Sequence, residues 1–333
     1  MKRNTCFIAA IMFAMVLLTA SGVFASEQNY YVTENGAGNY DGGSWANALK
    51  GTELAARLQK AQAGDIFYVA KGTYKPGTKN SDSFTLKKGV KLYGGFVGNE
   101  AVDELSVAGR NFRTNETVLS GKVDNSTNSK TVIKTGDSCD SSSLIDGFTI
   151  SDGQNNSSFG ANGGGMEIKG SPTVKNCLIK DNSAKGNGGG VLVASSIGTP
   201  VIEFCTFKSN TANNGGGVYV SDGEAKISNC TFESNTAKKD DWSTGGYGGG
   251  VYAGKKVRIV NCTFCGNDSD VSGNGFYNGS DFSSIMSSTF YRRAGNAKTE
   301  LFSSKSITVT NSIFWSDEDD SIIDGNGNRT VSY

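Results

Sequence analysis

The side chains in this sequence that could do chemistry are carboxylates, thiols, tyrosines and the bases lysine and arginine, whereas none of the 333 residues is histidine. Catalytic triads that use imidazole as the base are therefore excluded. Two carboxyl groups about 5–5.5 Å apart could still hydrolyse a glycosidic bond. At the three outward positions of the repeat that runs through the chain, acidic residues never fall in adjacent copies. We therefore predict no catalytic residue, although loops could still assemble a carboxylate pair.

Three tyrosines, Tyr219, Tyr252 and Tyr277, follow glycine-rich segments at the same offset in successive copies of the repeat. If the copies stack, these rings form an aromatic ladder that could grip the faces of sugars or the apolar surface of a partner. Alternatively, tyrosine simply suits an exposed strand and packs on its neighbours. We predict these three residues as the binding residues.

A threonine column is the second outward candidate, formed by Thr206, Thr231, Thr263 and Thr289. A flat threonine array could suggest ice binding. One column flanked by cysteine and phenylalanine is better explained by pairing of threonines between neighbouring strands.

The most acidic stretch, residues 317–320 followed by Asp324, Asn326 and Asn328, could offer hard oxygen ligands to calcium. The alternation is that of an EF-hand start, but Arg329 stands where glycine is required and no glutamate follows. We predict a solvated loop, no metal site and no cofactor.

An internal repeat must position these residues. Glycine triplets recur at intervals of 25, 27 and 33 residues, ending at Gly165, Gly190, Gly217 and Gly250. Each copy contains short runs rich in Val, Ile, Phe and Thr, punctuated by Gly, Asn and Ser, which are too short for helices. Three short strands in a turn of about 24 residues or more predict an all-β fold, a right-handed parallel β-helix. A propeller would need four strands and about 40 or more residues per blade.

The corner of each turn is predicted at an asparagine. Ile227 and Cys230 both look inward but are three residues apart, so a left-handed residue at Asn229 is needed to restore the alternation. The equivalent residues Asn176 and Asn261 would stack on it about 4.8 Å away, and the side-chain amides could hydrogen-bond along the stack. The next inward columns would be Cys177, Cys205, Cys230 and Cys262, then Ile179, Phe207, Phe232 and Phe264.

The chain divides into three segments. Residues 1–25 have a basic start, an apolar run and small residues before a cleavage position, which predicts a secretory signal peptide. Residues 26–115 do not repeat, and we expect a helix over 52–62, with Leu54, Leu58 and Ala61 on one face, to cap the open end of the β-helix. Residues 116–333 hold the repeats, and the strand-like last residues suggest that the β-helix continues beyond Tyr333.

Export would leave six cysteines, for which a disulfide framework is one reading. We favour the other, four small buried hydrophobes in a column, because parallel in-register neighbours rarely meet disulfide geometry. Cys139 and Cys265 fall outside the column and could be free thiols. Without residues 1–25 the chain has 30 basic and 32 acidic residues, so nothing in its charge favours nucleic acid.

The repeat resembles that of a known family. Gly-Gly-Gly-Val at 188–191, 215–218 and 248–251, together with three Phe-x-x-Asn segments, is similar to the Gly-Gly-Ala-Ile and Phe-x-x-Asn repeats of the chlamydial polymorphic outer-membrane proteins, with glycine in place of the commoner alanine. Those segments begin at Phe207, Phe232 and Phe264. The non-repeating start, including 44–48 and 69–74, looks like the opening of secreted bacterial parallel β-helix repeat proteins.

The resemblance implies surface display, with adhesion as the commonest role in the family. We therefore expect a secreted or cell-surface protein, adhesin-like and non-catalytic, that binds a host protein, a matrix protein or a glycan. We expect it to contact a membrane only through an anchor outside this sequence. A polysaccharide-active enzyme, either a lyase or a glycoside hydrolase, and a passive structural stalk remain the alternatives.

Overall fold

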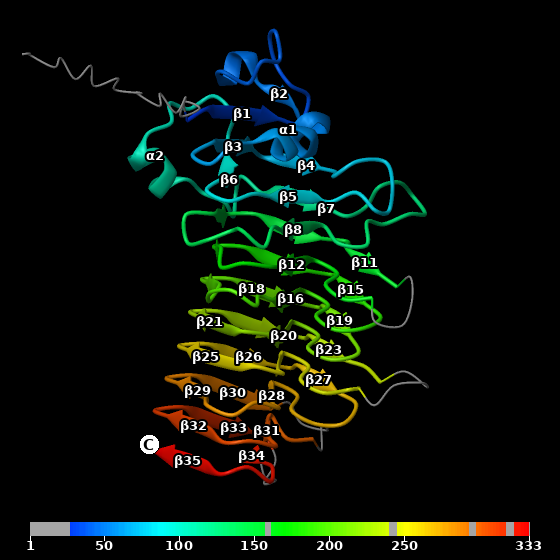
Figure 1. Cartoon of the computed structure of the whole chain (residues 1–333), viewed down its shortest axis with the longest axis vertical. Coiled ribbons are helices and arrows are strands. Elements are labelled where there is room, and N and C mark those ends of the chain that lie inside the picture. Colours follow the sequence, from blue (N-terminus) through cyan, green and yellow to red (C-terminus); the bar gives the residue numbers. More distant parts are fainter. Residues whose placement is uncertain (1–26, 157–160, 240–244, 293–297, 318–322, 333) are drawn as a thin grey trace, which may run out of the picture.

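The computed structural model describes residues 27–156, 161–239, 245–292, 298–317 and 323–332. The predicted signal peptide, residues 1–25, lies outside these residues. The described chain winds into one long column in which the sheets run along the axis (Figure 1). All strand pairs within these sheets are parallel, so the predicted parallel β-helix is confirmed.

Each regular turn visits sheet A, sheet B, a short corner sheet and sheet C, and then returns to sheet A one rung further along. The strands of sheet A, in pairing order, are β2 (Leu49–Lys50), β1 (Asn29–Thr33), β3 (Ile66–Ala70), β6 (Lys91–Phe96), β9 (Leu144–Asp146), β13 (Thr173–Lys175), β17 (Val201–Glu203), β21 (Glu224–Ser228), β25 (Lys256–Val260), β29 (Ser283–Met286), β32 (Ile307–Thr310) and β35 (Arg329–Ser332). Sheet B contains β4 (Gly72–Tyr74), β7 (Thr117–Ser120), β10 (Thr149–Ser151), β14 (Leu178–Lys180), β18 (Thr206–Lys208), β22 (Thr231–Glu233), β26 (Thr263–Cys265), β30 (Thr289–Arg292) and β33 (Ile313–Ser316).

Sheet C contains β5 (Phe84–Leu86), β8 (Ile133–Thr135), β12 (Met166–Ile168), β16 (Val191–Ala194), β20 (Val218–Asp222), β24 (Val251–Ala253), β28 (Phe276–Asn278), β31 (Leu301–Ser303) and β34 (Ile323–Asp324). The corner sheet contains β11 (Gln154–Asn155), β15 (Ser183–Ala184), β19 (Thr211–Ala212), β23 (Thr236–Ala237) and β27 (Asp268–Ser269). This fourth sheet was not anticipated from the three strands predicted per turn. Its two-residue strands are too short to produce an alternating pattern in the sequence.

The corner between sheets A and B has the predicted left-handed residues. Asn176, Asn229 and Asn261 have φ values of 53°, 54° and 51°, and Phe204 occupies the same corner with φ 54°. Asparagine tolerates this conformation because its short polar side chain can hydrogen-bond locally. The glycine triplets also mark tight bends, as predicted. At Gly188 a Cβ atom would meet the backbone oxygen of Val191 at 2.6 Å.

The prediction of an amide stack at this corner is largely wrong. Asn261 Nδ2 donates to Asn229 Oδ1 over 2.7 Å, but Phe204 interrupts the column and Asn176 Nδ2 donates to Asp146 instead. The continuous ladder is one corner further along and is buried, formed by the last residues of the three Phe-x-x-Asn segments and by Asn182, which ends the equivalent segment from Ile179: Asn182, Asn210, Asn235 and Asn267. Each side chain there also donates to a backbone oxygen of the preceding rung.

The interior between the sheets is filled by columns of like residues. Phe207, Phe232, Phe264 and Phe290 lie face to face, with ring centroids 4.7, 4.7 and 4.4 Å apart, and Phe314 extends the stack at 4.8 Å. Stacking at the rung spacing lets one side-chain type fill every turn, which is how a short sequence repeat builds a continuous core. The inward cysteine column is also confirmed, since all four of its members are buried.

The six cysteines of the described chain are all free thiols, and Cys265 alone among them is not buried. The sulfur atoms of the column donate weakly to backbone oxygens, as in Cys230 Sγ to Ser228 O at 3.1 Å. We expect one thiol to react with a thiol reagent in the native protein of residues 26–333 and six to react in denaturant. More than one rapidly reacting thiol in the native protein would contradict the packed column.

The N-terminal end of the column is closed by the predicted helix. It is shorter than the expected 52–62: a 3-10 turn, η2 (Gly51–Glu53), leads into α1 (Leu54–Lys60). Leu54 and Leu58 are buried, and α1 packs against β5 at the end of the column. A second 3-10 turn, η1 (Trp45–Asn47), places Trp45 against Tyr31 and Phe96 of sheet A, and a second helix, α2 (Glu104–Gly109), lies in a loop outside the column (Figure 1).

Near the other end, Glu300 is an acid whose side chain is 1% exposed. Burial raises its pKa to about 8, although Asn274 and the nearby Arg292 act in the opposite direction. The folded state therefore binds a proton that the unfolded state has released between about pH 4.5 and 8.

The contribution of Glu300 to the free energy of unfolding is therefore fully present below its pKa in the unfolded chain, about 4.5. It is lost as the pH rises through its pKa in the folded protein, about 8. We expect the free energy of unfolding of the native protein to fall by roughly 4 kcal/mol more than that of Glu300→Gln between pH 4.5 and 9. Denaturant melts of both proteins across this range provide the measurement. Parallel pH profiles would show that Glu300 does not titrate in this way.

Candidate functional site

The three tyrosines predicted as binding residues are brought together on the outward face of sheet C. Tyr219, Tyr252 and Tyr277 are direct cross-strand partners on β20, β24 and β28. Their ring centroids are 4.8 Å apart at both steps, with interplanar angles of 17° and 14°. The fixed two-residue offset from each glycine bend is what sets this register.

Two further rings, which the sequence reasoning missed, join them. Phe302 on β31 stacks on Tyr277 at 5.2 Å, and Tyr247 lies tilted against Tyr277 at 4.7 Å. We call Tyr219, Tyr252, Tyr277, Phe302 and Tyr247 the aromatic strip. Phe302 could have been found in the sequence, because it is one 25-residue repeat after Tyr277.

The stacking decides what the strip can offer to a ligand. The inner rings cover each other's faces, so the strip presents mainly ring edges and hydroxyl groups in a row at the rung spacing. Burial raises the pKa of the Tyr219 hydroxyl, and burial together with the neighbouring tyrosines raises that of Tyr252, so both are neutral donors at ordinary pH. This arrangement suits contact with a broad surface better than ring-on-sugar stacking.

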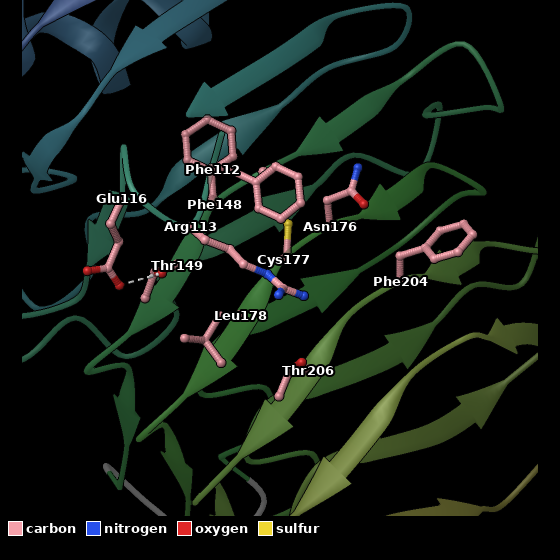
Figure 2. A pocket seen from close by; sticks show the side chains of 11 residues that line it. Phe112, Arg113, Glu116, Phe148, Thr149, Asn176, Cys177, Leu178, Phe204 and Thr206 are labelled. Carbon is pink, nitrogen blue, oxygen red and sulfur yellow. Dashed lines mark hydrogen bonds between the residues drawn. The ribbon is translucent and has the colours of Figure 1, made fainter. Parts of the chain in front are cut away.

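A second candidate site is a groove at the corner between sheets A and B, with a volume of about 340 Å³ (Figure 2). Its floor is the turn and strand region around β10, β14 and β18, and one wall is the segment 110–116, which leads into the first repeat. The groove is lined by Phe112, Arg113, Glu116, Gly147, Phe148, Thr149, Asn176, Cys177, Leu178, Phe204 and Thr206. Of the predicted threonine column, only Thr206 lines it.

A buried ion pair holds this wall in place. Arg110 Nη2 lies 2.5 Å from Asp146 Oδ1 on β9, and the two side chains are 5% and 2% exposed. The Arg110 guanidinium also covers the ring of Tyr93, and its Nε donates to Gly94 O over 2.7 Å. Lys175 approaches the other oxygen of Asp146 at 3.6 Å. The carboxylate at the end of β9 therefore anchors the segment that carries Phe112, Arg113 and Glu116.

Two glycines let this segment lie against the column. Gly95 has φ 92°, and a Cβ there would meet the backbone of Phe112 at 2.8 Å. Gly147 has φ 83°, and a Cβ there would meet the side chains of Arg110 and Phe112 at 3.3 Å. Both positions need a left-handed backbone and a close approach, which only glycine provides without strain.

Phe204 is the unusual residue of the groove. It has φ 54° at the corner position where neighbouring turns have asparagine, and it is 55% exposed. A bulky residue in the left-handed region is an outlier that costs about 1–3 kcal/mol. The side chain recovers little by burial, so neither local conformation nor packing accounts for phenylalanine here.

The described strands do not bring carboxylates together in pairs. In the strand registers of the described chain, no acidic residue has an acidic cross-strand partner; Glu167, for example, lies between Lys134 and Leu192. In the groove, Glu116 Oε1 accepts a hydrogen bond from Thr149 over 2.8 Å. The described residues contain no cluster of three potential metal ligands. Residues 318–322 of the acidic stretch considered for calcium lie outside the described part.

Comparisons with known proteins identify the fold. Residues 114–267 and 172–332 match the family described as "Right handed beta helix region". A solved structure titled "Crystal structure of pectate lyase Pel9A" superimposes with a TM-score of 0.52 and 14% sequence identity, over 92% of this chain and 78% of that chain. No curated protein matches the sequence. No helix in the described residues is long and apolar enough to cross a membrane. At this identity, the likeness to the lyase is a likeness of fold.

Proposed function

This chain belongs to the right-handed β-helix family, and we propose that it is an exported, adhesin-like protein that binds a host or matrix partner without catalysis. The observation that carries the proposal is the aromatic strip. Five aromatic rings lie in contact on one outward face, each partly exposed. Tyrosine supplies a large contact area with little conformational freedom to lose, and it is enriched at protein interfaces.

The geometry of the strip favours a protein partner over a sugar within the proposed class. A row of ring edges and neutral hydroxyls along the column matches a broad surface, whereas a sugar would need an open ring face. Export rests on the predicted signal peptide at 1–25, and surface display on the resemblance to the polymorphic outer-membrane repeat. The proposed location is therefore the cell surface or the extracellular medium.

The test compares native residues 26–333 with a variant in which Tyr219, Tyr252 and Tyr277 are changed to Ser, on an array of matrix proteins and glycans. A variant of Thr231, Thr263 and Thr289 to Ser, on sheet B, serves as the matched control. Since interface tyrosines often contribute more than about 1 kcal/mol each, we expect at least tenfold weaker retention of the tyrosine variant alone. Circular dichroism of all three proteins checks that the column is intact.

Equal retention of all three proteins would remove the strip as the binding surface. Absence of retention for any of them would favour the passive stalk. Polysaccharide cleavage is the remaining alternative, because a lyase shares the fold, and release of shortened glycan by the native protein would establish it.

A further inference from the structure

We propose that the groove between sheets A and B is a binding site for one neutral sugar ring of a glycan chain. This is a second site, on different sheets from the aromatic strip, and it does not rest on the strip being a binding surface. Three features carry the proposal: the exposed and strained Phe204, a basic and an acidic side chain that line the same groove, and the 110–116 segment that forms one of its walls.

Phe204 is the first argument. The repeat has asparagine at this corner in the turns on either side, at Asn176 and Asn229, and asparagine fits the left-handed backbone better. Phenylalanine also breaks the column in which Asn261 hydrogen-bonds Asn229. A residue that is unfavourable for the fold and exposes an apolar ring beside a groove indicates a role in binding.

The polar groups are the second argument. Arg113 is exposed, has no ion pair among the described residues, and lines the groove together with Cys177 and Thr206 (Figure 2). Glu116 uses one carboxylate oxygen to accept from Thr149. Sugar hydroxyls both donate and accept hydrogen bonds, so the guanidinium can donate to one pair of hydroxyls and the carboxylate can accept from another pair. Because the two charges are opposite, the site as a whole suits a neutral ligand.

The wall is the third argument. The 110–116 segment is seated by the Arg110–Asp146 ion pair and by the close approach at Gly95, and it adds the side chains of Phe112, Arg113 and Glu116 to the lining of the groove. The volume of about 340 Å³ lies at the lower end of the range of ligand pockets, which is roughly 300–1,000 Å³. Apolar rings with a few placed polar groups are the usual lining of such sites. One ring of a longer chain fits this open corner.

The carboxylate of Glu116 disfavours anionic ligands in the groove. A phosphate or an acidic peptide would be attracted by Arg113 but repelled by Glu116 in the same groove. Inorganic phosphate and an acidic peptide are therefore suitable competing probes in the test.

The experiment is saturation-transfer NMR and calorimetry of residues 26–333 with neutral hexose and N-acetylhexosamine oligosaccharides of two to four rings. We expect at least one oligosaccharide to bind, and Phe204→Asn to weaken that binding at least tenfold. Because this change restores the residue of the neighbouring turns, its melting temperature should equal or exceed that of the native protein. Arg113→Gln should also weaken binding, whereas Arg258→Gln on sheet A should not.

The proposal is overturned if no oligosaccharide of the panel binds, if Phe204→Asn binds as the native protein does, or if only phosphate or the acidic peptide binds. The serine variant of the aromatic strip separates the two sites. If this variant loses binding on the array but still binds the oligosaccharide, the result supports both the aromatic strip and the groove as separate binding sites. Loss of oligosaccharide binding in that variant would place the sugar on the strip and contradict the groove.

Discussion

Changing Asn235 to Ala is expected to lower the free energy of unfolding by about 3–5 kcal/mol. The Asn235 amide donates to Phe207 O and to Asn267 Oδ1, both at 2.9 Å, and its oxygen accepts from the backbone and side chain of Asn210 at 3.1 and 2.9 Å. All of these groups are buried. Alanine would leave several of them without a partner in a site that water does not reach, and each such group costs about 1–3 kcal/mol.

Asn229→Gly provides the matched control for this prediction. Asn229 is also a corner asparagine, but it is partly exposed, and glycine adopts its φ of 54° without strain. We expect a change within about 1 kcal/mol. Denaturant unfolding followed by circular dichroism compares the two variants. If Asn235→Ala were no less stable than Asn229→Gly, the buried ladder would not be the polar element that holds the turns together.

The second large effect is expected from Asp146→Ala. The change leaves the Arg110 guanidinium 5% exposed and without its carboxylate, and breaking such a pair costs about 3–5 kcal/mol. The 110–116 segment should then leave the column, so hydrogen exchange of its amides should accelerate together with the loss of stability. Oligosaccharide binding in the groove should be lost as well, since one wall of the groove is displaced.

Glu224→Ala is the control for the ion pair. Glu224 pairs with Lys256 and Arg258 on the outward face of sheet A, but all three side chains are partly exposed. Exposed pairs contribute about 0–1 kcal/mol. Similar losses of stability in the two variants, or unchanged exchange in 110–116 after Asp146→Ala, would contradict the anchoring role of Asp146.

The repeat made much of the fold predictable. The period required stacked turns, the three-residue step from Ile227 to Cys230 required the corner at Asn229, and the spacing of Leu54 and Leu58 required the capping helix. The amide ladder was placed at the wrong corner because several turns contain two asparagines near corners, and the two kinds differ in burial, which the sequence does not show directly. The sequence held one usable clue, namely that Asn235 and its equivalents recur without a break whereas Phe204 interrupts the other column.

The candidate sites could be predicted from the sequence less completely than the fold. The period placed Tyr219, Tyr252 and Tyr277 in one column, but it could not reveal that their faces cover one another, because ring orientation depends on packing. The groove was missed because Arg113 precedes the repeats and Glu116 stands at their start, where no periodic column of side chains marks either residue. Their position depends on a contact between Arg110 and Asp146, which lie 36 residues apart in the sequence.

The most direct test of the central claim is to pass residues 26–333 over immobilised matrix proteins and polysaccharides and to measure retention and released fragments together. We predict selective retention on at least one surface, reduced at least tenfold by the tyrosine-to-serine change, with no release of shortened glycan. Release of fragments by the native protein would contradict the claim by showing an enzyme, and the absence of retention on every surface would contradict it by showing a stalk.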